Sequence, residues 1–487
     1  MSPVIDPSLQ NLDELFPQEF SDEEKAQAKT LFLKNLSLEA HRFYGGKMQT
    51  LPKSGIYGFN WFNVWYTPGV SRISTEIRDD ADASFALSNR GNLVAVVSDS
   101  TRVLGDGDCG PAGGLGVMEG KAMLMKYLGG VDAVALCLDS RGADGRNDPQ
   151  KIIDFVRMVQ PSFGAINLED ISQPNCFKVL DELRETCEIP VWHDDAQGTA
   201  CITLAALINA LELAGKTLAQ AKIVLLGAGA SNTTVARLIL ASGGNPSKMI
   251  VFDSRGSLHQ GRDDIKTDPS HYRKWEICQS TNPGRVLAIE EALQDADVLI
   301  ALSQAGPDTV KRSWVRSMAQ KAIVFACANP VPEIWPYAAK EEGAFIVATG
   351  RGDFPNQVNN SVCFPGILKG ALLVGARKIS DAMVIRCAHS IAEYSRRRGI
   401  SPDNIIANME ETEVFAEEAA DVAMAAIEEG HARIILSREE VYRRARADID
   451  AARAMTEDLK RLGHIKEPPA EILHKALEDA IAGIRGS

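Results

Sequence analysis

The chain has 487 residues, more than one hydrophobic core usually supports, and 45% of them are hydrophobic. This composition excludes intrinsic disorder as the main state and predicts two or three domains. The net charge of −13 argues against nucleic acid and anionic lipid surfaces as partners. The longest apolar run, residues 201–215, is shorter than the ~20 residues of a membrane helix, and the acidic first residues do not resemble a targeting peptide. We therefore expect a cytoplasmic protein that does not span a membrane.

Four regions follow one another along the chain. Residues 1–43 predict a polar helical arm, because Ser21 and the acidic residues after it form a helix N-cap signal. Residues 44–197 and 198–376 each alternate short apolar runs with helical patterns, which is typical of parallel sheets with crossover helices. Residues 377–487 predict a charged helical extension. The fold class is therefore α/β: an N-terminal α/β catalytic domain, a doubly wound, Rossmann-like nucleotide domain and a helical C-terminal region. The expected strands are residues 94–97, 133–138, 165–168, 191–192, 223–226, 249–252, 298–301, 323–326 and 345–348.

A glycine motif opens the second series. Gly227 and Gly229 stand between an apolar strand and a helix, where bare backbone amides can hold a pyrophosphate. Asn232 replaces the usual third glycine, which should cost close packing of the helix on the strand. Asp253 ends the next strand and can accept hydrogen bonds from a ribose diol, which favours NAD, whereas Arg255 leaves NADP possible by pairing with a 2′-phosphate. The expected dinucleotide site comprises Gly227, Gly229, Ala230, Ser231, Asn232, Asp253, Ser254 and Arg255. The alternative is a tight turn followed by a surface acid.

Two acidic pairs end predicted parallel strands of the first series. They are Glu169-Asp170 and Asp194-Asp195, at the sheet edge where α/β proteins place their sites. Adjacent side chains at a strand end point to opposite faces, so only some of the four can converge unless the backbone turns. Three converging carboxylates without a nearby His or Cys cluster suit Mg²⁺ or Mn²⁺. Solvated loop acids are the alternative interpretation.

Two further residues are candidate acid–base groups. Lys121 follows a glycine-rich stretch, residues 105–120, and we expect it at the head of a helix, whose dipole would lower its pKa. Tyr66 precedes a Thr-Pro-Gly turn. Taken alone, a lysine in such a position is more often a surface residue, and such a tyrosine is more often an aromatic residue in a turn.

Together these residues occur in motifs, in the same order, that resemble the malic enzymes, particularly the shorter bacterial type. The motifs include Tyr66-Thr-Pro-Gly-Val, Val117-Met-Glu-Gly-Lys121, Ile166-Asn-Leu-Glu-Asp170, His193-Asp-Asp195, Gly227-Ala-Gly229, Ala328-Asn329-Pro330 and Phe354-Pro-Asn-Gln-Val-Asn-Asn360. The resemblance implies Glu169, Asp170 and Asp195 as metal ligands. It implies Lys121 as general base, Tyr66 as general acid and Asp194 as the residue that orients the lysine. It implies Arg102, Asn329 and Asn360 as substrate-binding residues, Asn329 also near the nucleotide.

The function implied is the metal-dependent oxidative decarboxylation of L-malate, or of a close dicarboxylic 2-hydroxy acid, to pyruvate and CO₂ with reduction of NAD or NADP. A redox-neutral malolactic reaction at the same site is one alternative, and a related decarboxylating dehydrogenase is another. A non-catalytic nucleotide-sensing protein is a third, because fold does not imply function. The resemblance also suggests a homodimer or homotetramer.

Overall fold

The computed structural model describes residues 5–103 and 105–486, which fall into two compact units. The first combines Met1–Lys53 with Ala454–Ser487, and the second is Ser54–Arg453. Each is described by itself.

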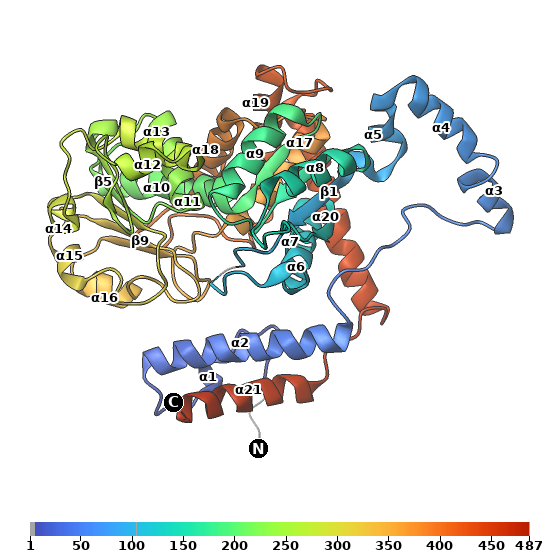
Figure 1. Ribbon diagram of the computed structural model, residues 1–487. Helices are drawn as coiled ribbons and strands as arrows, with labels where there is room; N and C mark the ends of the chain where they lie inside the picture. Colours follow the sequence, from blue (N-terminus) through green and yellow to red (C-terminus); the bar gives the residue numbers. More distant parts are fainter. Residues whose placement is uncertain (1–4, 104, 487) are drawn as a thin grey trace. The chain divides into compact units, whose positions relative to one another are not determined.

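The first unit packs the two ends of the chain on each other. Helix α2 (Asp22–Tyr44) begins with a capping box in which Ser21 and Glu24 satisfy each other's backbone N–H groups. It lies along α21 (Ala470–Arg485), and α1 (Leu12–Leu15) adds one turn (Figure 1). The buried side chains that join these helices include Leu12, Phe16, Phe32, Leu477 and Ala480. The polar helix expected near the N-terminus is therefore paired with a helix from the other end of the sequence.

The second unit contains two parallel sheets. The first has the order β2-β1-β3-β4 and the second the order β10-β9-β8-β5-β6-β7, with only the two-residue β7 antiparallel. The strands of the first are β1 (Leu93–Ser98), β2 (Asp132–Cys137), β3 (Ala165–Leu168) and β4 (Val191–His193). Those of the second are β5 (Ile223–Leu226), β6 (Met249–Asp253), β7 (Gly256–Ser257), β8 (Val298–Ala301), β9 (Ile323–Ala326) and β10 (Ile346–Thr349). The expected parallel strands are thereby confirmed, and β5, β8 and β9 are fully or almost fully buried, as apolar runs in a covered parallel sheet must be.

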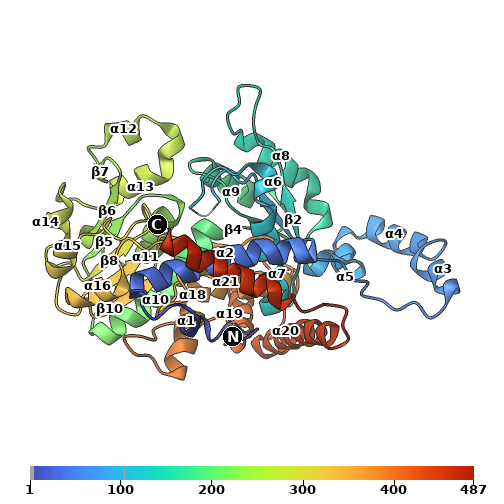
Figure 2. The ribbon, with the colours of Figure 1, turned by 90° about the horizontal axis from the view of Figure 1, so that it is seen from below.

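Helices cover these sheets and form a layer between them. Around the first sheet lie α6 (Gly110–Gly113), α7 (Leu115–Gly129), α8 (Pro149–Val159) and α9 (Asn175–Thr186). The nucleotide domain carries α11 (Ala230–Ala241), α12 (Asp263–Lys266), α13 (Tyr272–Ser280), α14 (Ile289–Leu293), α15 (Arg312–Arg316) and α16 (Pro336–Glu341). The remaining helices are α10 (Thr199–Ala214), α17 (Phe364–Leu373), α18 (Asp381–Arg398), α19 (Glu413–Glu428) and α20 (Arg438–Arg461). Figure 2 shows α12 and α13 at the β6–β7 side of the second sheet.

The central helix α10 is apolar along most of its length, and most of its residues are buried. Together with the turn before it, the segment Asp194–Ala214 is long and apolar enough to cross a membrane by length and composition. Its most apolar window is 78% buried inside the fold, which is the environment of a core helix.

A segment of the second unit projects away from the sheets. It holds α3 (Phe62–Trp65) and α4 (Val70–Asp79) and ends at α5 (Ser84–Leu87), where Ser84 is buried; α3 and α4 lie away from β1 in Figure 1 and away from β2 in Figure 2. No residue of α3 or α4 is buried. We call residues 54–87 the arm; this segment is distinct from the helical arm expected over residues 1–43.

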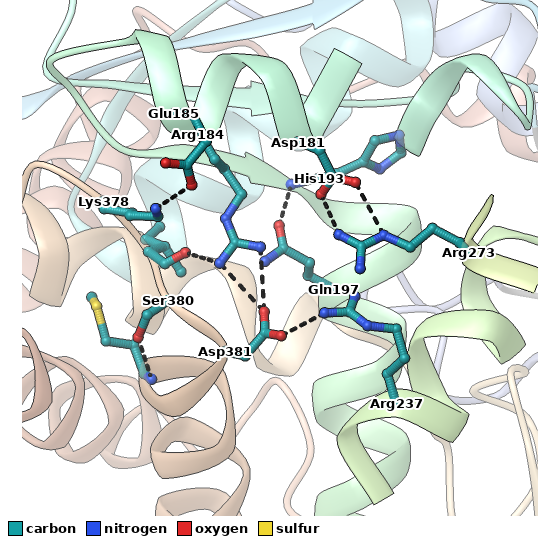
Figure 3. A network of polar contacts seen from close by, with 12 residues as sticks. Asp181, Arg184, Glu185, His193, Gln197, Arg237, Arg273, Lys378, Ser380 and Asp381 are labelled. Carbon is teal, nitrogen blue, oxygen red and sulfur yellow. Dashed lines mark hydrogen bonds and ion pairs between the residues drawn. The ribbon is translucent and has the colours of Figure 1, made fainter. Parts of the chain in front are cut away.

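Ion pairs join helices of the second unit that come from different parts of the chain. Asp381 of α18 accepts bonds from Arg184 of α9 at 3.3 Å and from Arg237 of α11 at 2.6 Å (Figure 3). Arg273 of α13 binds Asp181 of α9 at 2.6 Å. The network therefore ties α9 of the first sheet to α18 and to two helices of the second sheet, α11 and α13.

Candidate active site

The two sheets of the second unit share a cleft of about 1280 Å³ at the carboxyl ends of their strands. Many of the residues singled out from the sequence line it. They are Arg102, Lys121, Glu169, Asp170, Asp195, Gly227, Gly229, Ala230, Ser231, Asp253, Ser254, Asn329 and Asn360. Asp194, Asn232 and Arg255 lie outside the lining, and so does Tyr66.

Three carboxylates meet at the first sheet's end of the cleft. One oxygen from each of Glu169, Asp170 and Asp195 lies within 4.8 Å of the others. Glu169 and Asp170 are neighbours in sequence, and they converge because Asp170 adopts a left-handed conformation, with φ of 53°, that turns the chain after β3. Its backbone N–H donates to Asp195 at 2.8 Å, which ties the ends of β3 and β4 together. The backbone turn that convergence required is therefore present.

The electrostatics of this cluster favour a cation. Burial raises the pKa of Glu169 well above its usual value, and the charges of Asp195, Asp194 and Asp170 raise it further against the opposing effect of Lys121. Glu169 also accepts a hydrogen bond from Asn167 at 3.0 Å, which fixes its orientation. An all-oxygen anionic set of this kind fits a hard divalent ion such as Mg²⁺ or Mn²⁺.

Lys121 lies beside the carboxylates. Its Nζ forms an ion pair with Asp194 and a second one with Glu169 at 3.2 Å. Asn360 Oδ1 is 3.4 Å away, and the ring of Phe364 lies 4.6 Å from the ammonium. Helices α7 and α17 and the end of β4 thus hold one amine in a single position.

The expectation of a helix-head lysine with a lowered pKa was wrong. Lys121 is the seventh residue of α7, in its second turn, so the helix N-terminus is not its neighbour. Burial lowers its pKa, but the charges of Asp194, Glu169 and Asp195 outweigh burial, and the pKa is raised. A cation bound by these carboxylates would oppose that increase.

Asp194 and Asp195 face different sides of one turn. Asp195 lines the cleft, whereas the Asp194 side chain is fully buried and accepts a hydrogen bond from Trp192 Nε1 at 3.1 Å. The turn, Asp194–Gly198, is a π-helix, and a Cβ on Gly198 would lie 2.0 Å from Asp194 Oδ1. The absence of a side chain at Gly198 therefore leaves space for the Asp194 carboxylate, which forms the ion pair with Lys121.

The other end of the cleft has the features of a phosphate cradle. Gly227 has a φ of 96°, and a Cβ there would lie 2.4 Å from the Leu302 carbonyl. Gly229 is the N-cap of α11, whose first residues face the cleft. Asn232 does not loosen the turn as expected: its buried amide donates to the carbonyls of Leu226 and Gly227, both at 3.0 Å. The side chain therefore stabilises the contact between strand and helix that a glycine would make by close approach.

Asp253 has a partner that the sequence did not indicate. Arg262 Nη1 and Nη2 bind the two oxygens of Asp253 at 3.0 and 2.9 Å. Burial raises the pKa of Asp253, but the bonds from Arg262 outweigh it and lower the pKa below its usual value. Arg255 instead pairs with Asp264 at 3.2 Å and is exposed. No motif marks Arg262; only the β6–β7 turn brings it back to the strand end.

Tyr66 is not brought to the site in its own chain. Its side chain is on the arm and is 72% exposed. The surrounding aromatic residues are exposed as well; they include Tyr57, Phe59, Trp61, Phe62 and Trp65. The cleft therefore holds the base, the carboxylates and the phosphate cradle, but not the tyrosine.

Comparisons with known proteins give one consistent family. Residues 47–184 match the family model "Malic enzyme, N-terminal domain", and residues 196–429 match "Malic enzyme, NAD binding domain". The chain is 40% identical to the "Bifunctional malic/malolactic enzyme" of Bacillus subtilis, over 85% of this chain and 98% of that one. It is 41% identical to the "NAD-dependent malic enzyme" of Geobacillus stearothermophilus, over 80% of this chain and 78% of that one. The crystal structure of Entamoeba histolytica malic enzyme, at 59% identity, superposes with a TM-score of 0.97 over 99% of both chains.

Proposed function

Because the chain belongs to the malic enzyme family, we propose that it oxidises L-malate at C2 and decarboxylates the product to pyruvate and CO₂, while a nicotinamide dinucleotide is reduced. The observation that carries this proposal is that Lys121 and three carboxylates meet in the cleft that also contains the Gly227–Gly229 cradle. One end can hold a hydroxy acid on a cation, and the other can hold a dinucleotide phosphate.

Lys121 is the residue placed to move the first proton. Its amine, held by Asp194, accepts the proton of the substrate C2 hydroxyl as hydride leaves C2. Asp194 orients the amine from below and does not itself face the cleft. Arg102 can pair with a substrate carboxylate, and Asn329 and Asn360 can donate their amides to substrate oxygens. Loss of CO₂ then leaves a carbanionic C3 that needs a proton, which is the step assigned to Tyr66.

Glu169, Asp170 and Asp195 would hold the divalent cation, Mg²⁺ or Mn²⁺. When bound, such an ion acts as a Lewis acid that polarises the C2 oxygen. The residues themselves supply the anionic oxygens, and Asn167 and the Asp170 backbone hold two of them in place.

The dinucleotide is proposed to be NAD, with NADP as a weaker substrate. Asp253 lines the cleft and stays ionised, so it can accept hydrogen bonds from a ribose diol and repel a 2′-phosphate. We also propose that the enzyme is cytoplasmic.

A redox-neutral malolactic reaction is the second candidate. It is favoured by the name of the Bacillus subtilis relative, which joins malic and malolactic activity. One assay separates the two: L-malate, NAD and Mn²⁺ are mixed with the enzyme, and reduced nicotinamide and lactate are both measured. Accumulating reduced nicotinamide with pyruvate supports the proposal. Lactate without net reduction would replace it by the malolactic reaction, and neither product would contradict both.

We further propose that the enzyme works as a homodimer, or as a homotetramer built from such dimers, in which each arm reaches the cleft of a second copy. A solvent-exposed row of aromatic side chains along the arm is costly in a monomer, and such rows are typical of protein interfaces. The arm also carries the tyrosine that the cleft lacks. A twofold symmetric exchange of arms would cover both rows and complete both sites.

A further inference from the structure

Three thiols and one carboxylate meet in the core, outside the cleft. Cys201 of α10, Cys363 before α17, Cys387 of α18 and Glu418 of α19 each have an exposed fraction of 0%. The four helices that carry them pack against one another. None of these four side chains has a part in the chemistry proposed above.

The three sulfurs lie close enough together to share one tetrahedral metal ion, and Glu418 lies beside one of them. The sulfurs of Cys363 and Cys387 are 3.9 Å apart, and Cys387 Sγ lies 3.9 Å from Glu418 Oε2. All three sulfurs lie within 4.8 Å of one another. Zinc–sulfur bonds of about 2.3 Å in a tetrahedron place sulfurs about 3.8 Å apart, so only small side-chain movements are needed.

Glu418 points to a missing ligand in this cluster. Its Oε1 atom is buried without a hydrogen-bond partner among the described residues, and of these its Oε2 atom accepts only from the weak donor Cys387 Sγ. A buried carboxyl group with an unsatisfied oxygen costs free energy unless something binds it. The space is made for it, because a Cβ on Gly366 would lie 2.2 Å from Glu418 Oε2.

The surroundings also offset part of the negative charge that a thiolate set brings. Cys363 is the N-cap residue of α17, a helix of 10 residues, so it stands at the positive end of the helix dipole, although its side chain caps no backbone N–H group. Cys201 also donates to the Val384 carbonyl at 3.5 Å, which holds its sulfur in the cluster.

We propose that Cys201, Cys363, Cys387 and Glu418 form a second metal site, a structural zinc site that ties α10, α17, α18 and α19 together. Binding of one Zn²⁺ displaces the three thiol protons and the carboxyl proton to solvent and forms three Zn–S bonds and one Zn–O bond. The net charge of the bound set is then that of a Cys₄ zinc site. Because the cluster is fully enclosed, the ion enters while the chain folds.

The site has a consequence for the cleft. Cys363 directly precedes Phe364, whose ring lies against Lys121, and it follows Asn360 by three residues. Cys201 follows Asp195 by six residues, through the turn that leads into α10. A zinc ion here would therefore restrict the backbone that carries Asn360 and Asp195, and the ring of Phe364 that contacts Lys121.

Zinc content provides the first test. The full chain is expressed with added zinc, passed through EDTA to remove weakly bound ions, and analysed by mass spectrometry of metals. We expect about one zinc per chain in the wild type, and less than a tenth of that in the Cys363→Ala/Cys387→Ala variant. Cys278→Ala is the matched control, since Cys278 is a fully buried thiol of α13 outside the cluster and should leave the zinc content unchanged.

Cobalt gives a readout that does not depend on a variant that folds. Protein expressed with added Co²⁺ should show a thiolate-to-cobalt charge-transfer band and the intense visible bands of tetrahedral cobalt. The carboxylates of the cleft contain no sulfur, so Glu169→Gln should leave this spectrum unchanged. Wild-type protein without retained zinc, retained cobalt without a thiolate band, or zinc unaffected by the double cysteine variant would each overturn the proposal.

Discussion

Arg262 holds both oxygens of the Asp253 carboxylate, at 3.0 and 2.9 Å, at the nucleotide end of the cleft. The same guanidinium binds Asp264 through Nε at 2.8 Å, and the Arg262 side chain is buried. The carboxylate is thereby held in one orientation, and part of its charge is compensated. A 2′-phosphate would therefore meet less repulsion at Asp253 than an unpaired acid would exert.

This pairing predicts how the preference for NAD over NADP responds to substitution. Asp253→Ala should narrow the NAD/NADP ratio of kcat/KM, because the repulsive charge and the ribose acceptor are both lost. Arg262→Gln should widen it, by roughly tenfold for 1.4 kcal/mol, because the charge of Asp253 is then uncompensated. Arg255→Gln is the control, because Arg255 pairs with Asp264 and does not line the cleft. Fluorescence titration with NADH and NADPH measures binding directly. An Arg255 effect larger than that of Arg262 would contradict this account.

Loss of Lys121 should abolish proton removal and leave the rest of the cleft intact. Lys121→Ala is expected to lower kcat for malate oxidation by about 10² to 10⁴, the usual cost of losing a general base. NADH binding should stay within a few-fold of the wild type, because the lysine and the Gly227 cradle lie on different helices and strands. Lys126→Ala is the control, because Lys126 is a partly buried lysine of the same helix that pairs with Asp132 outside the cleft. A Lys121→Ala enzyme with more than half of the wild-type kcat would exclude the lysine as the base.

Removal of one carboxylate should act through the metal ion. Glu169→Gln is expected to raise the Mn²⁺ concentration needed for half-maximal activity, and excess Mn²⁺ should restore part of the rate, because a neutral oxygen attracts a divalent ion less strongly. Glu182→Gln, a change of similar kind on α9 and outside the cleft, should leave the Mn²⁺ titration unchanged. Full wild-type activity after exhaustive chelation would show that no metal is required.

Much of the fold was predictable because its strands are short apolar runs between clear helical patterns. The residues of β1, β3 and β5 are almost all Val, Ile, Leu or Ala, which is typical of a parallel sheet covered on both faces. The glycines at 227 and 229 could also be placed on a strand-to-helix turn from sequence alone. These features depend on neighbours in the chain.

The details of the site depend on contacts that neighbours in the chain do not determine. Lys121 and Asp194 are 73 residues apart, and their contact exists only because α7 packs beside the turn after β4. That contact, and not the helix dipole, sets the electrostatics of the lysine. The convergence of Glu169 and Asp170 depends on one backbone angle, and Arg262 on the path of one hairpin. No periodicity reports these arrangements.

The arm presents the same problem on a larger scale. Its motif identifies Tyr66 as a candidate acid, but only the structure reveals that the side chain is exposed and absent from the cleft of its own chain. Two arrangements would bring Tyr66 close to Lys121. The arm could fold back onto the cleft of its own chain, or it could reach the cleft of a second copy. They make opposite predictions for mixtures of two inactive enzymes.

Lys121→Ala and Tyr66→Phe should each be nearly inactive in forming pyruvate from L-malate when measured alone. If the arm crosses to a second copy, a mixed dimer pairs the intact lysine of one chain with the intact tyrosine of the other in one of its two sites. Random mixing makes about half of the dimers mixed, so the mixture should recover about a quarter of wild-type activity. The two variants are mixed, their subunits are allowed to exchange at low protein concentration, and pyruvate formation is then measured. Tyr57→Phe is the control for a change on the surface of the arm. It should be active when measured alone, because Tyr57 has no proposed part in the reaction. If Tyr66 instead serves its own chain, every site in the mixture lacks one group, and no activity returns.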